Sequence, residues 1–303
     1  MRRPDETTVA GPQPPVLPNC YISDAIVPEP LNLKRLLPAG APATAAEIVA
    51  GFGLDALAAS GSSTGGRERP YVMLNMVSTV DGHATLGGRS GGLSSAADRE
   101  LFHDLRLAVD AVMAGAGTVR VERYGRIIPD ESRRRLRVER GLSEEPLACI
   151  VSGRLTLEAD IPLLADPAAR VAILTPSAAS LPESAAEVHY IRAERDGLLD
   201  LPKAFAELRE RFGVRTLLCE GGPHLNAQLL EAGLVDELFL SLAPTLVGGD
   251  PVAGGEALRI IAGAELSPPV ELELLSTLES ASHLFLRYRV KGLPGDEVAA
   301  AGR

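Results

Sequence analysis

The sequence predicts an α/β fold built on a central, mostly parallel β-sheet that ends in an antiparallel strand pair. Short apolar runs of strand character alternate with segments whose apolar residues recur at helical spacing, which is typical of parallel sheets. The last two apolar runs are close enough along the chain to pair as antiparallel neighbours. The predicted strands are 71–77, 109–114, 147–152, 170–175, 187–192, 214–219, 237–243, 271–277 and 282–290, and the predicted helices are 96–108, 201–212 and 223–233.

The N-terminal part of the chain is predicted to lie outside the main body. Its first residues are rich in proline and show no apolar periodicity, so they cannot bury enough surface to offset their ordering entropy. Apolar segments at 31–37 and 45–57 suggest short helices packed on the body, and the Gly/Ser-rich run 61–66 suggests a flexible linker. The predicted divisions are a disordered tail at 1–20, an extension and linker at 21–68, the body at 69–292 and a second tail at 293–303.

The composition is that of an ordinary globular protein. A chain of 303 residues with 46% hydrophobic residues can bury a full core. The net charge of −10 would repel nucleic acid, and the one dense basic run, 133–140, is interpreted as a solvated loop or helix face. We therefore expect no nucleic-acid partner.

The cysteines and the hydropathy indicate the cytoplasm. Cys20, Cys149 and Cys219 are an odd number without metal-ligand spacing, so we expect reduced thiols and no metal site. No window of 18 uninterrupted apolar residues exists, and the N-terminus lacks the apolar run of a signal peptide. We expect no membrane partner.

The predicted helix at 96–108 has a charged stripe opposite its apolar side. Ser95 and Asp98 form an N-terminal capping pattern. The stripe falls at helical spacings of four, three and four, and consists of Arg99, His103, Arg106 and Asp110. It is either a solvated face with a salt bridge or a ligand-binding face.

Residues 214–233 predict a strand, a glycine turn and a helix N-terminus in direct succession. The apolar run ends in Glu220, Gly221 and Gly222 follow, and Pro223 opens the helix. Two glycines allow a ligand to approach the main chain, and the free N–H groups of a first helical turn can bind phosphate. An ordinary strand-to-helix connection is the alternative.

Four motifs in chain order resemble the C-terminal reductase domain of the bifunctional riboflavin-biosynthesis deaminase-reductase. They lie at 71–82, at 103–106 with 110–119, at 220–223 with 229–238, and at 235–249. The resemblance covers about residues 70–290. It implies a fold similar to dihydrofolate reductase, with helices on both faces of the sheet. The deaminase's zinc motifs are missing, so the resemblance implies a stand-alone reductase of the actinobacterial type.

The resemblance implies NADPH-dependent reduction of 5-amino-6-(5-phosphoribosylamino)uracil, with a hydride passing to C1′ of the opened sugar. Catalysis of this kind rests mainly on positioning. Asn75, Asp81 and Glu220 are the predicted catalytic residues. Many relatives have Lys where this chain has Asn75, so that side chain cannot deliver a proton, and a satisfied core amide is the alternative.

Three residues are predicted to bind substrate. Ser90 and Arg106 match the family's sugar-phosphate contacts, and a guanidinium fork suits phosphate. Gly92 stands where the family has a Trp. Residues 121–126 depart from the family's Asp-containing pattern, so the carboxylate role of that Asp could pass only to Glu122.

The remaining predicted site residues would hold the cofactor. Ser152 and Arg154 would meet the 2′-phosphate of NADPH, although a plain turn is an equal interpretation. The predicted cofactor contacts are Thr79, Gly115, Gly117, Thr118, Ser152, Arg154, Gly221 and Gly222.

Other assignments stay open. A related reductase with another pteridine-like or pyrimidine substrate, such as dihydrofolate, or a non-catalytic NADPH-binding protein would also fit parts of the sequence. A homodimer is expected because the apolar runs 235–246 and 284–290 would be bare sheet edges, which the family pairs about a two-fold axis.

Overall fold

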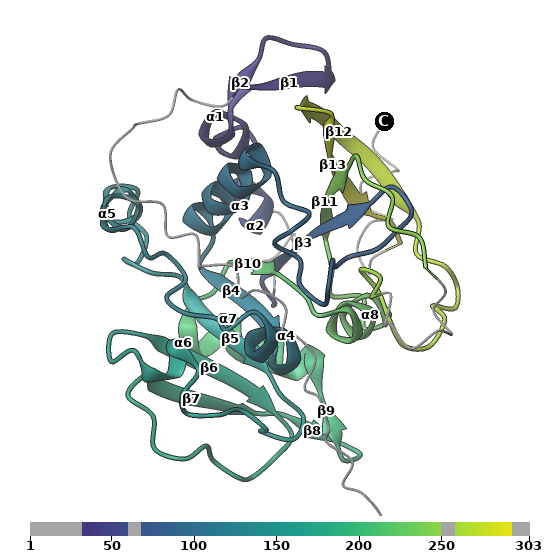
Figure 1. Cartoon of the computed structure of the whole chain (residues 1–303). Helices are drawn as coiled ribbons and strands as arrows, with labels where there is room; N and C mark the ends of the chain where they lie inside the picture. The colour runs from purple at the N-terminus through teal and green to yellow at the C-terminus, as the bar shows by residue number, and fades with distance from the viewer. Residues whose placement is uncertain (1–31, 60–67, 250–257, 293–303) are drawn as a thin grey trace, which may run out of the picture. The chain divides into compact units, whose positions relative to one another are not determined.

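A computed structural model describes residues 32–59, 68–249 and 258–292. The predicted tails at 1–20 and 293–303 and the linker at 61–66 lie outside these ranges. Within them, one eleven-stranded sheet has the order β2-β1-β12-β13-β11-β3-β10-β4-β5-β6-β7 (Figure 1). Its strands are β1 (Asn32–Leu37), β2 (Ala43–Thr44), β3 (Tyr71–Thr79), β4 (Ala111–Gly115), β5 (Leu147–Val151), β6 (Arg170–Thr175), β7 (Glu187–Arg192), β10 (Thr216–Cys219), β11 (Glu237–Ala243), β12 (Leu272–Ser280) and β13 (His283–Val290). Two short strands, β8 (Glu194–Arg195) and β9 (Leu198–Leu199), pair separately.

The sheet is parallel from β11 to β7 and antiparallel beyond β11. Neighbouring strands in the order β11-β3-β10-β4-β5-β6-β7 all run parallel. β13 runs antiparallel to both β11 and β12. The predicted mostly parallel sheet and C-terminal antiparallel pair are confirmed. The expectation that β11 and β13 are bare edges is wrong, because each has a neighbour on both sides.

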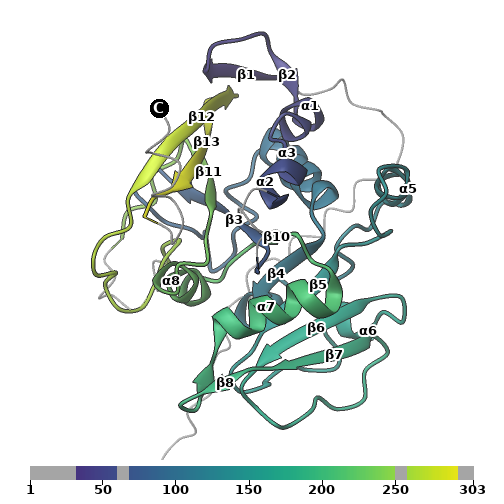
Figure 2. The same cartoon turned by 180° about the vertical axis from the view of Figure 1, so that it is seen from behind.

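Helices cover both faces of the sheet, as the two opposite views show (Figures 1 and 2). Side chains alternate along each strand, so Val112 and Ala114 join one core cluster and Ala111 and Met113 join the other. The helices on the first face are α1 (Ala45–Ala50), α2 (Leu54–Ala59), α3 (Ala96–Ala108), α4 (Ala116–Val121) and α6 (Pro162–Ala165), and those on the second are α7 (Leu201–Phe212) and α8 (Pro223–Glu231). None of the helices in the described ranges is long and apolar enough to cross a membrane.

The N-terminal segment is part of the same core. The predicted helix at 31–37 is wrong: this segment is strand β1, which pairs with β12 in the register Lys34↔Glu279. Six residues are too few for a helix to be stable alone, whereas the otherwise bare edge of β12 offers a row of backbone partners. The helices predicted over 45–57 are confirmed as α1 and α2, and Thr44 and Glu47 form a capping box on α1. The ring of Phe52 lies 5.2 Å from that of Phe239 on β11.

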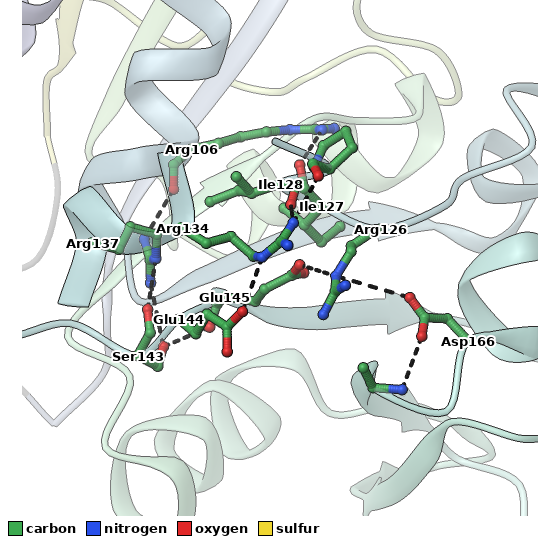
Figure 3. Close-up of polar contacts among 12 residues, drawn as sticks. Arg106, Arg126, Ile127, Ile128, Arg134, Arg137, Ser143, Glu144, Glu145 and Asp166 are labelled. Carbon is green, nitrogen blue, oxygen red and sulfur yellow. Dashed lines mark hydrogen bonds and ion pairs between the residues drawn. The ribbon is translucent and has the colours of Figure 1, made fainter. Parts of the chain in front are cut away.

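The basic run at 133–140 lies largely in α5 (Glu131–Glu139), and its interpretation as a solvated face is wrong for two of its arginines. Arg134 is 9% exposed and Arg137 is fully buried. The Arg137 guanidinium donates to the carbonyl oxygens of Leu107 and Val109. It also donates to that of Arg106 (Figure 3). These carbonyls at the end of α3 have no partner within the helix, so Arg137 satisfies them.

Candidate active site

A cavity of about 340 Å³ lies between β3, α3, α4 and the turn that follows β10. Five predicted site residues from distant parts of the sequence line it together: Asn75, Ser90, Thr118, Glu122 and Glu220. The cavity lies toward the carboxyl ends of β10 and β4, where the chain leaves parallel strands for helices. This is the usual place of ligand sites in open α/β sheets.

Glu220 is held by a buried arginine. Nε and Nη2 of Arg106 donate to the two carboxylate oxygens of Glu220, at 2.7 Å each. Nη1 of Arg106 donates to the carbonyl oxygen of Ile127 at 2.9 Å, and the guanidinium stacks 4.2 Å from the ring of Phe102. These bonds use three of the five guanidinium N–H groups, and the phosphate contact of Arg106 stays a prediction.

Tyr124 completes the surroundings of Glu220. Its hydroxyl donates to Oε2 of Glu220 at 2.5 Å. Burial, followed by the charge of Glu220, raises the pKa of Tyr124 well above its usual value, so the hydroxyl keeps its proton. The sequence analysis missed Tyr124 because it searched 121–126 only for a replacement carboxylate. A lone aromatic residue in a polar loop was the signal available.

The segment that carries Tyr124 is held in place by arginine side chains that bond its backbone carbonyl groups. Besides the bond from Arg106 to Ile127, Nη1 of Arg134 donates to the carbonyl oxygens of Ile128 and Pro129, at 2.9 and 2.7 Å (Figure 3). Helix α5 therefore positions the loop that reaches the cavity.

Ser90 and Glu122, both predicted to bind substrate, bind each other. The backbone N–H and the hydroxyl of Ser90 donate to Oε1 of Glu122, at 3.0 Å each. These bonds join the loop after β3 to the end of α4. The second carboxylate oxygen of Glu122, on the cavity wall, has no hydrogen bond from the part of the chain that the structure describes.

Asn75 and His103 present unpaired polar groups to the cavity. Both are half-buried, and neither side chain has a hydrogen bond to the described residues. Burial lowers the pKa of His103, and the nearby charges of Arg133 and Arg106 lower it further. His103 is therefore an uncharged imidazole near neutral pH. The sequence analysis assigned it only to a charged stripe.

Asp81 and Thr79 do not reach the cavity. The Asp81 carboxylate accepts from the hydroxyl of Thr79 and from the backbone N–H groups of Val247 and Gly248. These bonds, the one from Thr79 first, lower the pKa of Asp81 to about 2. Thr79 is fully buried, and its hydroxyl also accepts from the N–H of His83. The structure therefore supports a loop-bracing role rather than the predicted catalytic and cofactor contacts.

The glycine turn after Glu220 forms a bare backbone surface. The N–H of Gly115 donates to the carbonyl oxygen of Gly221 at 2.7 Å, and Gly221 and Gly222 are joined by a cis peptide bond. A Cβ on Gly222 would lie 2.8 Å from Oγ1 of Thr118, so no other residue fits there without displacement. Among the described residues, no side chain caps the start of α8, and the space around Gly117 is open. Free N–H groups at a helix start suit the phosphates of a dinucleotide.

The predicted 2′-phosphate contacts lie beyond β5. β5 is the parallel neighbour of β4, with Val151 opposite Gly115, so the turn after it shares the edge with the glycine surface. Ser152 is 3% exposed, whereas Arg154 is exposed and makes no hydrogen bond or ion pair with the described residues. Of the two residues, Arg154 is thus the one available to bind a phosphate.

In the described ranges, no three His, Cys, Asp or Glu side chains gather as metal ligands.

A cavity at the carboxyl ends of parallel strands, beside a glycine turn that opens a helix, is the arrangement of an α/β enzyme with a phosphate-bearing ligand. The sequence model of the RibD C-terminal domain matches residues 70–285. The chain belongs to the RibD C-terminal domain family.

Relatives of known name agree with this membership. The chain is 31% identical over 232 residues to the 2,5-diamino-6-ribosylamino-4(3H)-pyrimidinone 5′-phosphate reductase of Methanothermobacter thermautotrophicus, covering 74% of this chain and 100% of the relative. The enzyme of that name from Aquifex aeolicus is 32% identical over 206 residues, 63% of this chain and 86% of its own. Among solved structures, a pyrimidine reductase-like protein from Corynebacterium diphtheriae superimposes with a TM-score of 0.60 at 26% identity, covering 74% and 92% of the two chains.

Proposed function

We propose that this protein reduces 5-amino-6-(5-phosphoribosylamino)uracil to its ribitylamino product with NADPH. One observation carries the proposal: Glu220, held by Arg106 and Tyr124, lines the cavity and is followed directly by the Gly221-Gly222 turn. The carboxylate that would face the substrate and the glycine turn that would bind the cofactor's phosphates are therefore adjacent in the chain and in space. The names of the relatives from Methanothermobacter and Aquifex support a pyrimidine ribosylamino phosphate as substrate.

The cofactor side of the proposal uses the glycine surface. Gly115, Gly117, Thr118, Gly221 and Gly222 would contact the pyrophosphate, and the open space around Gly117 would allow its close approach to the main chain. Bound NADPH supplies a hydride to C1′ of the opened sugar. Arg154 would bind the 2′-phosphate and favour NADPH over NADH, because its guanidinium has no competing partner among the described residues.

The substrate side uses the cavity wall. The unpaired amide of Asn75 would hydrogen-bond the pyrimidine or the sugar. Glu220 would stabilise positive character on the imine-like sugar, and its two bonds from Arg106 fix the orientation of the carboxylate. Arg106 is then a positioning residue. Ser90 and Glu122 would meet the substrate as a bonded pair.

A second substrate is favoured by the names of the relatives. The 2,5-diamino-6-ribosylamino-4(3H)-pyrimidinone 5′-phosphate named for them differs from our proposed substrate in its pyrimidine substituent, and carries the same ribosylamino phosphate. Both compounds present the same reacting carbon. The enzyme's preference between the two substrates would therefore depend on its contacts with the pyrimidine ring.

We include a homodimer in the proposal. On one face of the sheet, Leu240 pairs with Leu286 and Leu242 with Leu284, and all four side chains are half-buried. Leu272 and Leu274 of β12 continue this surface, and are 40% and 41% exposed. Apolar side chains so grouped favour contact with a second copy through the sheet face rather than through strand edges.

A cytoplasmic location is also part of the proposal. Cys149 and Cys219 are buried free thiols, which are typical of proteins from reducing compartments.

The proposal is tested by following nicotinamide absorbance with purified protein. Each of the two ribosylamino phosphates and dihydrofolate is supplied in turn, with NADPH and then NADH. We expect turnover with a ribosylamino phosphate, and preference for NADPH. Turnover of dihydrofolate alone would redirect the assignment, and binding of NADPH without any turnover would indicate a non-catalytic protein.

A further inference from the structure

We propose that Asp98 on α3 binds the pyrimidine ring of the substrate and makes the protein prefer the 2,5-diamino compound over the uracil. This inference rests on the proposed function and concerns the two substrates considered there. The observation that carries it is a buried carboxylate on the cavity wall that receives no hydrogen bond from the described residues. A buried carboxylate is costly in this state, and a ligand with N–H groups would supply the missing donors.

Asp98 differs from the other two carboxylates of the cavity wall. Glu220 accepts from an arginine and a tyrosine, and Glu122 accepts from Ser90. Asp98 is 9% exposed, and its side chain has no hydrogen bond or ion pair within the described ranges. Its two oxygens are nevertheless not sealed in the protein interior. Because the residue lines the cavity, a ligand bound there can reach them.

Neither the start of α3 nor the neighbouring cation uses this carboxylate. The Ser95 hydroxyl accepts from the backbone N–H of Asp98 at 3.1 Å, but the described contacts do not include the return bond of a capping box, from the N–H of Ser95 to the Asp98 side chain. Arg99 donates instead to the carbonyl oxygen of Ser94 at 2.8 Å. The positive end of the helix favours a negative charge at this position, so the carboxylate is kept in place for a ligand.

The chemistry of the substrate selects its pyrimidine end for Asp98. A carboxylate repels a phosphate dianion, whereas the pyrimidine ring carries N–H donors. Asp98 lies on α3 about two turns before Arg106, which binds Glu220. A ring joined to the sugar carbon beside Glu220 would therefore present its far edge, the atoms N3 and C2, to Asp98.

The two substrates differ at this edge of the ring. The 2,5-diamino-4(3H)-pyrimidinone has an N–H at N3 and an amino group at C2, and these adjacent donors match the two oxygens of a carboxylate. The uracil has the same N–H at N3 but a carbonyl oxygen at C2, which a carboxylate oxygen repels. A carboxylate at this position therefore favours the diamino compound.

The test compares kcat/KM for the two ribosylamino phosphates on the full-length protein with NADPH. The wild type should favour the diamino compound by about 10- to 100-fold, the usual range for losing a charged hydrogen bond. Asp98→Asn should reverse the preference, because the amide oxygen accepts from N3–H and the amide N–H donates to the uracil carbonyl at C2. Asp98→Ala should abolish the preference, since its side chain offers neither a donor nor an acceptor.

Asp104→Asn is the matched control. It is the same substitution on the same helix, and Asp104 does not line the cavity, so the preference should remain that of the wild type. A wild type without the preference would overturn the inference and leave the proposed function intact. So would an Asp98→Asn variant that changes kcat/KM for both compounds by the same factor, and a lower melting temperature of that variant would assign Asp98 to the start of α3 instead. Failure of the wild type to reduce either compound would overturn the proposed function as well.

Discussion

Glu220 lies where the inner wall of the cavity meets the glycine turn, with its charge balanced by Arg106 and its orientation set by Tyr124. A carboxylate so placed can act electrostatically on a reacting carbon without reorganising. The contact between Arg106 and Glu220 joins residues 114 positions apart, so local patterns could not predict it. The sequence identified both residues but not their contact, because residue type indicates what a side chain can bind and not which partner it meets.

Glu220→Gln tests this role. The amide keeps the shape and loses the charge, so kcat should fall by about 10²- to 10³-fold while the Kd of NADPH changes little. The melting temperature should also fall, since Arg106 stays buried without a charged partner. Steady-state kinetics, NADPH titration and thermal melting are measured on one preparation. A stable and fully active variant would remove Glu220 from the catalytic assignment.

The lowered pKa of Asp81 predicts how the stability of the protein depends on pH. Its pKa is lowered in the fold to about 2 from the ordinary 3.8, so its ionised form stabilises the protein above pH 3.8 and this contribution is lost as the pH falls toward 2. Asp81→Asn should therefore unfold at lower urea than the wild type at neutral pH, and the difference should close between these two values. We expect kcat at saturation to stay near that of the wild type.

The control for Asp81 is Asp160→Asn, an exposed carboxylate paired with Arg123 on the surface. Its urea midpoint should differ little from that of the wild type at any pH. A large loss of kcat in Asp81→Asn with unchanged stability would restore the predicted catalytic role.

Among the secondary-structure elements, the sequence predicted best the strands that are buried on both faces of the sheet. The parallel strands are continuous apolar runs bounded by turns, so their existence follows from local composition. β1 could not be predicted in this way, because its strand state depends on the edge of β12, whose paired residues lie 240 to 245 positions later in the chain. α5 was missed as a buried element since Arg134 and Arg137 are buried by carbonyl partners that the local sequence does not show.

Two neighbouring carboxylates anchor the central strands. Asp236 accepts from Arg69 and from the backbone N–H of Val72, and Glu237 receives two 2.8 Å bonds from Arg287. Glu237 is 1% exposed. Both residues belong to the family motif, and their contacts here are structural.

Glu237→Gln should lower the free energy of unfolding by about 3–5 kcal/mol, because it leaves Arg287 buried with a neutral partner. Glu273→Gln is the matched control: Glu273 pairs with Arg289 at the same 2.8 Å on the surface, and should cost less than about 1 kcal/mol. Urea unfolding measures both. Equal losses would show that burial does not decide the strength of these pairs.

At the scale of the whole molecule, the apolar face of β11, β13 and β12 predicts self-association. Light scattering at micromolar concentration should give twice the 31.8 kDa of one chain. Leu286→Arg places a charge in the centre of this face and should yield monomers. A monomeric wild type would contradict the proposed dimer, and a dimeric Leu286→Arg would move the interface elsewhere.

The most direct measurement of the central claim is the path of the hydride. NADPH carrying deuterium at both C4 positions is incubated with the protein and 5-amino-6-(5-phosphoribosylamino)uracil, and the product is analysed by mass spectrometry and NMR. The proposed reaction predicts a ribitylamino product that contains one deuterium, bound to C1′. Oxidation of NADPH without deuterium in the product, or deuterium at any other carbon, would contradict it.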